Sequence, residues 1–161
     1  MFDVQISARP LDIASAAGRF SAGDTQLGAV VQFTGVVRGE QVRELELEHY
    51  PGMTERILKH TLERAAKRWP VRRASVVHRV GVIALGEPIV WVAVGSSHRA
   101  AAFSACEFIM DFLKIEAPFW KKEHLSDGSS RWVESRQSDV ERATKWNGAS
   151  PAKLIGEQTA R

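Results

Sequence analysis

Residues 87–123 read EPIVWVAVGSSHRAAAFSACEFIMDFLKIEAPFWKKE, and this stretch decides the fold because it joins elements of different type. Residues 87–95 are dominated by β-branched and aromatic side chains, which is typical of a strand. Ser96 or Ser97 can cap a following helix from about His98 to Lys114. Pro118 then ends the helical pattern, and residues 117–123 are expected to form another strand.

The rest of the chain extends this mixture of strands and helices. Further strands are expected over residues 2–7, 28–38, 43–50, 74–81 and 131–135, helices over residues 11–20 and 51–69, and a last turn or two over residues 137–146. A hairpin through GEQ (39–41) is expected to join the strands at 28–38 and 43–50. Hairpins imply antiparallel pairing, so the predicted class is α+β, with a mainly antiparallel sheet and two principal helices. Residues 1–146 are expected to form a single domain and residues 147–161 a flexible tail.

The composition argues against several classes of protein. Of the 161 residues, 44% are apolar and 25% are charged, as in ordinary globular domains. The net charge of +3 is too small to demand a nucleic-acid partner, and the single cysteine, Cys106, excludes an internal disulfide and a multi-cysteine metal site. The sequence has no secretory signal pattern and no apolar run of membrane-spanning length, so a cytoplasmic protein without a membrane partner is expected.

One face of the helix expected over residues 98–114 has cations at both ends and apolar residues between them. Steps of three or four residues along this face give Arg99, Phe103, Cys106, Met110 and Lys114. Its apolar middle is expected to belong to the core, with Cys106 as a small buried hydrophobe in preference to a nucleophile. At the helix start, free backbone N–H groups beside His98 and Arg99 favour an anion, although a solvated arginine is the alternative.

Lysines bracket the break at Pro118. Lys114 closes the helix, and Lys121 can return toward it if the chain folds back as a strand beside an apolar wall of Phe119 and Trp120. Two ammonium groups brought together beside aromatic rings raise each other's cost of being charged. At least one lysine pKa should therefore fall, which would allow that lysine to move a proton near neutral pH.

The neighbours of Lys121 are consistent with a site and also with a solvated turn. In an extended strand, Lys121 and Glu123 share one face and Lys122 points to the other. Glu123 could balance the charge of a turn in which no ligand binds. Arg38, at the end of the strand expected over residues 28–38, is likewise either an anion ligand or the polar residue that starts a turn.

Long stretches of the chain resemble the large, catalytic subunit of molybdopterin synthase. The resemblance is carried by GAVVQFTGVVRG, LELEHYPGMTE, HRVG, SSHRAAAFSACEFIMDFLKIEAPFWKKE and RWVES. It implies an α+β homodimer with a small ubiquitin-like sulfur-carrier subunit docked at each outer end, a heterotetramer. It also implies a sulfurtransferase: the carrier's Gly-Gly tail ends in a thiocarboxylate and supplies two sulfurs to cyclic pyranopterin monophosphate, giving the dithiolene of molybdopterin. Neither a metal nor an organic cofactor is implied.

The resemblance also implies roles for individual positions. Lys114 and Lys121 match the two lysines that the family places at the reaction centre. The positions that match its substrate ligands or their motifs are Val36, Val37, Arg38, His98, Arg99, Lys122 and Glu123. Phe33 and Met110 would line the pocket, and Arg136 matches a further basic position. Two features depart from the pattern of the family. Val36 lies where some relatives are expected to have a polar or basic residue, and the connection GEQ is shorter than the loop expected in other relatives.

A geometric argument adds that the site is shared between two subunits. Arg99 and Lys114 lie on one helix fifteen residues apart, which separates them by about 22 Å at ~1.5 Å per residue. A single pterin cannot easily touch both. Each pocket is therefore expected to combine Arg38, Lys114 and Lys121 of one subunit with His98 and Arg99 of the partner subunit.

Two other classes of function compete with this interpretation. A non-catalytic binding module would capture the tail of a ubiquitin-like carrier and leave the pterin unconverted. A nucleic-acid binder would stack bases on Trp120, Trp132 and Trp146. Against it, acidic residues are interleaved with the basic ones throughout the chain, and most tryptophans lie in runs expected to be core.

Overall fold

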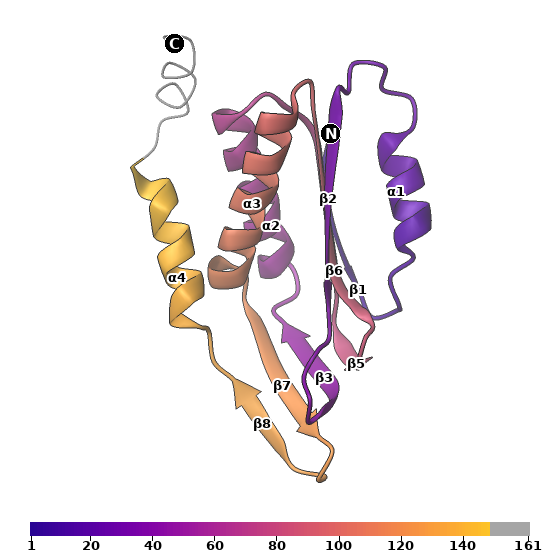
Figure 1. Ribbon diagram of the computed structural model, residues 1–161, viewed down its shortest axis with the longest axis vertical. Helices are drawn as coiled ribbons and strands as arrows, with labels where there is room; N and C mark the ends of the chain where they lie inside the picture. Colours follow the sequence, from indigo (N-terminus) through magenta and orange to yellow (C-terminus); the bar gives the residue numbers. More distant parts are fainter. Residues whose placement is uncertain (149–161) are drawn as a thin grey trace.

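The computed structural model describes residues 1–148 and shows two sheets with helices packed beside them (Figure 1). The strands are β1 (Phe2–Ser7), β2 (Ala29–Val36), β3 (Val42–His49), β4 (Val71–Arg79), β5 (Gly81–Ala84), β6 (Pro88–Ser96), β7 (Phe119–Leu125) and β8 (Ser130–Val133). The helices are α1 (Ile13–Ser21), α2 (Met53–Arg68), α3 (Arg99–Glu116) and α4 (Gln137–Thr144), followed by a short 3-10 helix, Lys145–Asn147. Of the predicted tail, all but Asn147 and Gly148 lies outside the described residues.

The first sheet, sheet A, has the strand order β1-β4-β6-β2. β1 runs parallel to β4, and the other neighbours are antiparallel. Alternating side chains of β6 serve two cores: Val90, Val92 and Val94 pack with α2 and α3, whereas Trp91 and Ala93 pack with α1. Figure 1 shows the resulting layers, with α1 on one side of sheet A, α2 and α3 on the other, and α4 outside α3.

The second sheet, sheet B, has the order β5-β3-β7-β8 and is antiparallel throughout. It has a core of its own, formed by Val37, Val42, Leu45, Leu47 and Ile83. Phe119, the first residue of β7, packs against this core and also against the core between sheet A and its helices. The predicted α+β class, mainly antiparallel and with α2 and α3 as principal helices, is confirmed.

The predicted hairpin between residues 28–38 and 43–50 is wrong. β2 pairs with β6 in sheet A, whereas β3 pairs with β5 and β7 in sheet B. The chain between them is held by the turn before β6, since Val37 N donates to Glu87 O at 3.0 Å and Gly86 N donates to Val37 O at 2.8 Å. Gly39 then has φ of 147°, and a Cβ there would lie 2.6 Å from Cγ2 of Val42. A glycine therefore fits the crossing from one sheet to the other.

α3 buries a face that differs in part from the expected one. Its core positions include Ala101, Ala102, Ala105, Phe108, Ile109 and Phe112. Cys106 is buried, as predicted. Phe103 was expected in the core but is 63% exposed, because it lies on the solvent stripe with Arg99, Glu107 and Lys114. Of the five residues on the expected stripe, Arg99, Phe103 and Lys114 therefore lie on the outer face of the helix, and Cys106 and Met110 do not.

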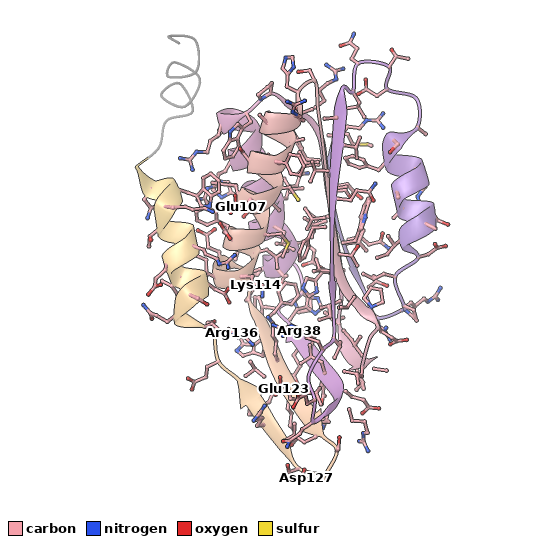
Figure 2. All side chains as sticks on the ribbon, viewed as in Figure 1. Arg38, Glu107, Lys114, Glu123, Asp127 and Arg136 are labelled. Atoms are coloured by element: carbon pink, nitrogen blue, oxygen red, sulfur yellow. The ribbon has the colours of Figure 1, made fainter. Side chains whose placement is uncertain are left out.

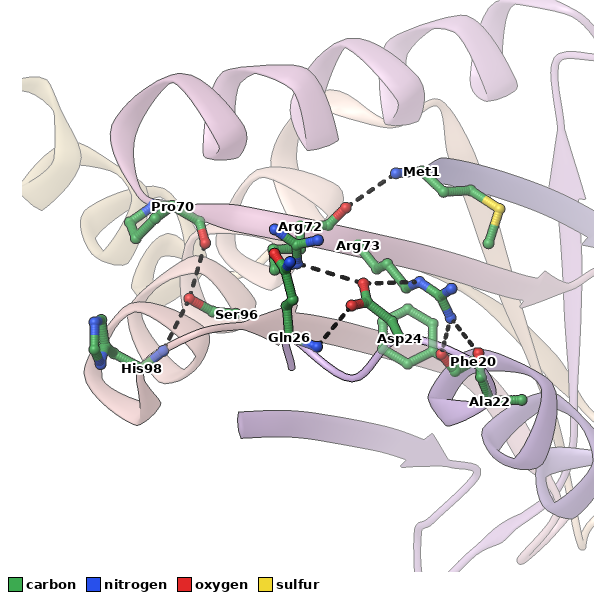
Figure 3. Close-up of polar contacts among 10 residues, drawn as sticks. All are labelled: Met1, Phe20, Ala22, Asp24, Gln26, Pro70, Arg72, Arg73, Ser96 and His98. Carbon is green, nitrogen blue, oxygen red and sulfur yellow. Dashed lines mark hydrogen bonds and ion pairs between the residues drawn. The ribbon is translucent and has the colours of Figure 1, made fainter. Parts of the chain in front are cut away.

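Polar contacts hold the loop that connects α1 to β2 against the start of β4 (Figure 3). Asp24 pairs with Arg72 at 3.4 Å and with Arg73 at 3.6 Å. Arg73 Nη1 also donates to the carbonyl oxygens of Phe20 and Ala22, at 2.7 and 3.0 Å. One acidic residue thus joins the end of α1 to the start of β4.

The start of α3 is fixed by a serine that is not its N-cap (Figure 3). Ser96 Oγ donates to Pro70 O at 2.9 Å and accepts from the backbone N–H of His98 at 3.4 Å. His98 is the N-cap residue and makes no side-chain cap hydrogen bond. The expectation that Ser96 or Ser97 caps the helix is therefore wrong, because the strand β6 continues through Ser96.

Candidate active site

A pocket opens at the C-terminal end of α3, where sheets A and B meet. Its polar lining comprises Arg38, His78, Lys114, Lys121, Glu123, Glu134, Ser135, Arg136 and Asp139. Its apolar lining includes Val36, Val37, Leu45, Leu113, Phe119 and Val133. Figure 2 shows Arg38, Lys114 and Arg136 gathered at this end of α3, with Glu123 farther along β7. Residues distant in sequence are thus brought together by the meeting of the two sheets.

Cations from three parts of the chain give the pocket its positive charge: Arg38, Lys114, Lys121 and Arg136. Burial is the largest cause that lowers the pKa of Lys121; Lys114 lowers it further, Asp139 raises it and Arg136 lowers it. The predicted fall of a lysine pKa is therefore found at Lys121. A lysine in this environment releases its proton closer to neutral pH, whereas the arginines stay charged.

Carboxylates stand beside these cations. Glu123 lies on the pocket face of β7, as the strand alternation predicts, and its Oε2 accepts from Arg131 Nε at 2.8 Å. Glu134 and Asp139 reach the pocket from the segment after β8. Sequence reasoning missed both, because they lie in an exposed polar run without periodicity. Both flank Arg136, and Glu134 also belongs to RWVES, one of the stretches that carry the resemblance.

α4 is held against α3 by polar contacts. Trp146 Nε1 donates to Asp111 Oδ2 of α3 at 2.7 Å. Lys145 forms ion pairs with Glu107 and Asp111. These contacts dock the C-terminal end of α4, and the start of the same helix supplies Asp139 to the wall of the pocket.

His78 is a further pocket residue that sequence reasoning missed. It lies on β4 and is only 3% exposed. Burial is the main cause that lowers its pKa, to about 4, so the ring is neutral near pH 7. Nδ1 lies 2.8 Å from the Arg79 carbonyl oxygen, and because a carbonyl only accepts, Nδ1 carries the proton. Two signals could have found His78: the alternation that buries Val76 on the same strand face, and its place at the start of HRVG, a stretch that carries the resemblance.

Several expected site residues do not line this pocket within one chain: Phe33, Met110, His98, Arg99 and Lys122. His98 and Arg99 are exposed at the opposite end of α3. Lys122 points away from the pocket, as the alternation predicts, and its Nζ lies 5.5 Å from the centre of the Trp132 ring. Phe33 is 39% exposed on β2, and Met110 is half-buried on α3. Their roles in a site stay predictions.

The expected apolar wall of Phe119 and Trp120 needs a correction. Phe119 lines the pocket, but Trp120 is 49% exposed and does not. Neighbouring residues of a strand point to opposite faces, so Trp120 lies with Lys122 on the outer face of sheet B. Trp132 is also largely exposed, at 56%, so the tryptophans are less uniformly part of the core than expected.

Residues 1–148 show neither a metal site nor a membrane-spanning helix. No three His, Cys, Asp or Glu side chains in this part of the chain gather in a way that could hold a metal ion. None of its helices combines the length and the apolar character needed to cross a membrane.

Known proteins share the sequence and the fold of this chain. A family model described as "MoaE protein" matches residues 6–116. A Vibrio cholerae protein named molybdopterin synthase catalytic subunit is 54% identical over 129 residues, which cover 78% of this chain and 85% of that protein. A solved Burkholderia ambifaria structure, "Molybdopterin biosynthesis MoaE protein", is 42% identical with a TM-score of 0.79, covering 92% of this chain and 100% of that one. A Helicobacter pylori structure, a "protein-protein complex of subunit 1 and 2 of Molybdopterin-converting factor", shares the fold at 19% identity, with a TM-score of 0.71 over 83% of this chain and 91% of that one.

Proposed function

Since the chain belongs to the MoaE protein family, we propose that it acts as the catalytic subunit of molybdopterin synthase and transfers sulfur. The sulfur comes from the thiocarboxylated C-terminus of a small ubiquitin-like carrier subunit. Two sulfurs are delivered in succession to cyclic pyranopterin monophosphate. The product is the dithiolene of molybdopterin.

The observation that carries this proposal is the pair Lys114 and Lys121 in a pocket that also holds Arg38 and Arg136. A phosphate and a thiocarboxylate are both anions, so their repulsion opposes the reaction. Positive charge at the pocket offsets that repulsion, most strongly at the half-buried Lys121 and less at Arg38, Lys114 and Arg136, which are exposed. The pocket therefore suits a reaction in which two anions must meet.

The two kinds of cation suit different roles. Arginine stays charged at neutral pH, so Arg38 is proposed to bind the phosphate. Lys121, whose pKa is lowered chiefly by burial, is proposed to take up and return the proton that moves during sulfur transfer, beside Lys114. Val36, Val37 and Glu123 line the same pocket and are proposed to contact the substrate.

The site is proposed to be shared between the two subunits of a homodimer. His98 and Arg99 begin α3 and Lys114 lies near its end, about 22 Å away along an unbroken helix. Within one chain, His98 and Arg99 therefore cannot reach a small ligand held at Lys114. In the proposed dimer, these two residues of one subunit complete the phosphate site of the other.

The proposed partners are two carrier subunits, one for each pocket, which give a heterotetramer with the homodimer. The Helicobacter pylori complex of two different subunits, which has this fold, supports a partner of this kind. The proposed chemistry uses no metal or organic cofactor. The proposed compartment is the cytoplasm, a reducing environment that suits a chain with one buried, unpaired cysteine.

The proposal is tested by mixing the protein with thiocarboxylated carrier and cyclic pyranopterin monophosphate and measuring the dithiolene product. Carrier that ends in an ordinary carboxylate is the matched control, because it offers the same docking surface and tail without sulfur. Product with the thiocarboxylate alone is expected. Carrier binding without any product would instead identify the chain as a non-catalytic binding module.

Cys106→Ala is expected to lower the free energy of unfolding by roughly 1 kcal/mol and to leave turnover unchanged. The side chain is buried, and burial first, then Glu107, raises the pKa of its thiol to about 11, so it is a poor nucleophile. Urea unfolding gives the stability, and the dithiolene assay gives the rate. A large loss of rate in a folded variant would show that Cys106 handles sulfur.

Asp139→Asn is expected to shift the rise of turnover with pH toward lower pH. The Asp139 charge raises the pKa of Lys121, against the lowering by burial and Lys114, so removing that charge lets the pKa fall further. More Lys121 is then neutral at a given pH, and turnover that needs the neutral amine begins earlier. The pH profile of single-turnover rates measures the shift. A profile that moves to higher pH would contradict a role for neutral Lys121.

A further inference from the structure

Phe119 lies at the seam between the two sheets, directly beside the pocket. It packs against the core of sheet A and its helices and also against the core of sheet B. In the β3–β7 ladder it pairs with His49, the last residue of β3, so the pairing of β7 begins at Phe119. The preceding residue is Pro118, which has no N–H to donate. Phe119 N donates to Ala117 O at 2.8 Å, and the Phe119 side chain links the start of β7 to both cores.

One of these contacts is a ring stack with His78 of sheet A. The two ring centres lie 3.9 Å apart, and the ring planes differ by 15°. His78 sits on β4, which is paired on both sides, with Ile6 of β1 and Val90 of β6 facing His78. The histidine thus belongs to the interior of one sheet, whereas Phe119 begins a strand of the other.

A hydrogen bond to the backbone of β4 fixes the orientation of the His78 ring. Its Nδ1–H donates to the Arg79 carbonyl oxygen, which prevents the ring from turning away from Phe119. Nε2 of His78 has no hydrogen-bond partner among the described residues. It is not fully buried, because Arg79 Nε is the one fully buried side-chain nitrogen or oxygen without a partner in residues 1–148. Since His78 lines the pocket, its Nε2 is open to the pocket. A neutral ring also adds no charge beside Lys114 and Lys121.

The ring stack also affects Lys121, because residues two apart in a strand lie on the same face. Phe119 and Lys121 both line the pocket, and Lys121 follows Phe119 on the same side of β7. We propose that His78 is a positioning residue for Lys121, acting through Phe119: the ring stack fixes the start of β7 and thereby the place and burial of the Lys121 ammonium group. This inference rests on the proposed function for its effect on rate, but the placement of Lys121 can be measured without it.

The experiment separates the ring of His78 from its hydrogen bond. His78→Phe keeps a ring to stack on Phe119 and loses the donor to Arg79, whereas His78→Asn keeps a donor near the position of Nδ1 and loses the ring. Phe119→Leu removes the stack from the other side. His124→Asn is the matched control, since His124 lies on the outer face of β7, where it pairs with Glu46 at 2.7 Å.

The first measurement is turnover with thiocarboxylated carrier and cyclic pyranopterin monophosphate. His78→Asn and Phe119→Leu are expected to lower kcat by at least about tenfold with little change in KM, because small displacements of a catalytic group are costly. His78→Phe is expected to melt a few degrees lower and yet keep kcat within about threefold of the wild type. If His78 had only a structural role, kcat would follow the melting temperature, and the variant with the lower melting temperature would have the lower kcat.

The second measurement is the pKa of Lys121 in the free protein, followed by NMR of labelled lysine side chains and assigned with Lys121→Arg. Burial is the largest cause of its lowered pKa; Lys114 and Arg136 lower it further, and Asp139 opposes them. In His78→Asn and Phe119→Leu the pKa is therefore expected to rise toward its ordinary value, while His78→Phe and His124→Asn leave it low. Unchanged kcat and unchanged Lys121 pKa in folded His78→Asn overturn the proposal. If the wild type forms no product but this pKa responds as expected, the proposed function fails and the positioning role stands.

Discussion

Lys121→Arg is expected to slow molybdopterin formation by at least about a hundredfold in a protein that remains folded. Guanidinium keeps the positive charge but cannot release a proton near neutral pH. Lysine at this position can, because burial first and then the charge of Lys114 lower its pKa. The rate is measured in single turnovers with saturating thiocarboxylated carrier, so that a change in carrier binding does not enter.

Lys122→Arg provides the comparison for this result. It makes the same chemical change one residue along β7, on the outer face over Trp132 and away from the pocket. Because arginine keeps the positive charge that Lys122 is predicted to offer a substrate, the rate of this variant is expected to stay within about threefold of the wild type. Near-normal turnover in Lys121→Arg would reduce Lys121 to a source of fixed charge and leave the proton to another group.

Mixed dimers of Lys114→Ala and Arg99→Ala subunits are expected to recover activity that neither variant has alone. If each pocket takes Lys114 from one subunit and Arg99 from the other, a mixed dimer has one complete pocket and one that lacks both residues. Random exchange of equal amounts makes half of the dimers mixed, so about a quarter of wild-type activity should return. The assay follows dithiolene formation after subunit exchange.

A second mixture excludes recovery by any other route. Lys114→Ala and Lys121→Ala remove residues that line the same pocket of the same chain. Every pocket in their mixed dimer lacks one lysine, so no activity should return. If the Lys114→Ala and Arg99→Ala mixture also stays inactive although subunits have exchanged, the pocket is not shared in the proposed way.

The parts of the site that the sequence predicted are those with local signals. The step of a helix and the proline break placed Lys114 at the end of α3, and the alternation of a strand put Lys121 and Glu123 on one face with Lys122 on the other. Hydrophobic periodicity, together with the proline and glycine breaks, located most helices and strands to within a few residues. Each of these properties depends on neighbours in the sequence, so a single chain is enough to read it.

The parts that the sequence did not predict depend on pairing between distant strands. The stretches 28–38 and 43–50 look like two arms of a hairpin, yet they belong to different sheets, and no separate strand was expected where β5 lies. His78 and Asp139 enter the pocket only because sheet A, sheet B and α4 meet there. The alternation of a strand indicates which of its faces is apolar but not which strand lies beside it. The sequence pattern around His78 therefore does not indicate which residues of other strands lie next to it.

The docking of α4 by Trp146 and Asp111 also determines when the site is complete during synthesis. A growing chain leaves the ribosome from its N-terminus, so both lysines emerge before Arg136, Asp139 and the tryptophan that secures their helix. Until Trp146 is added, the hydrogen bond from Trp146 that docks α4 on α3 cannot form. A chain that ends before Trp146 would therefore contain both lysines and lack the contact that secures the wall beside Lys121.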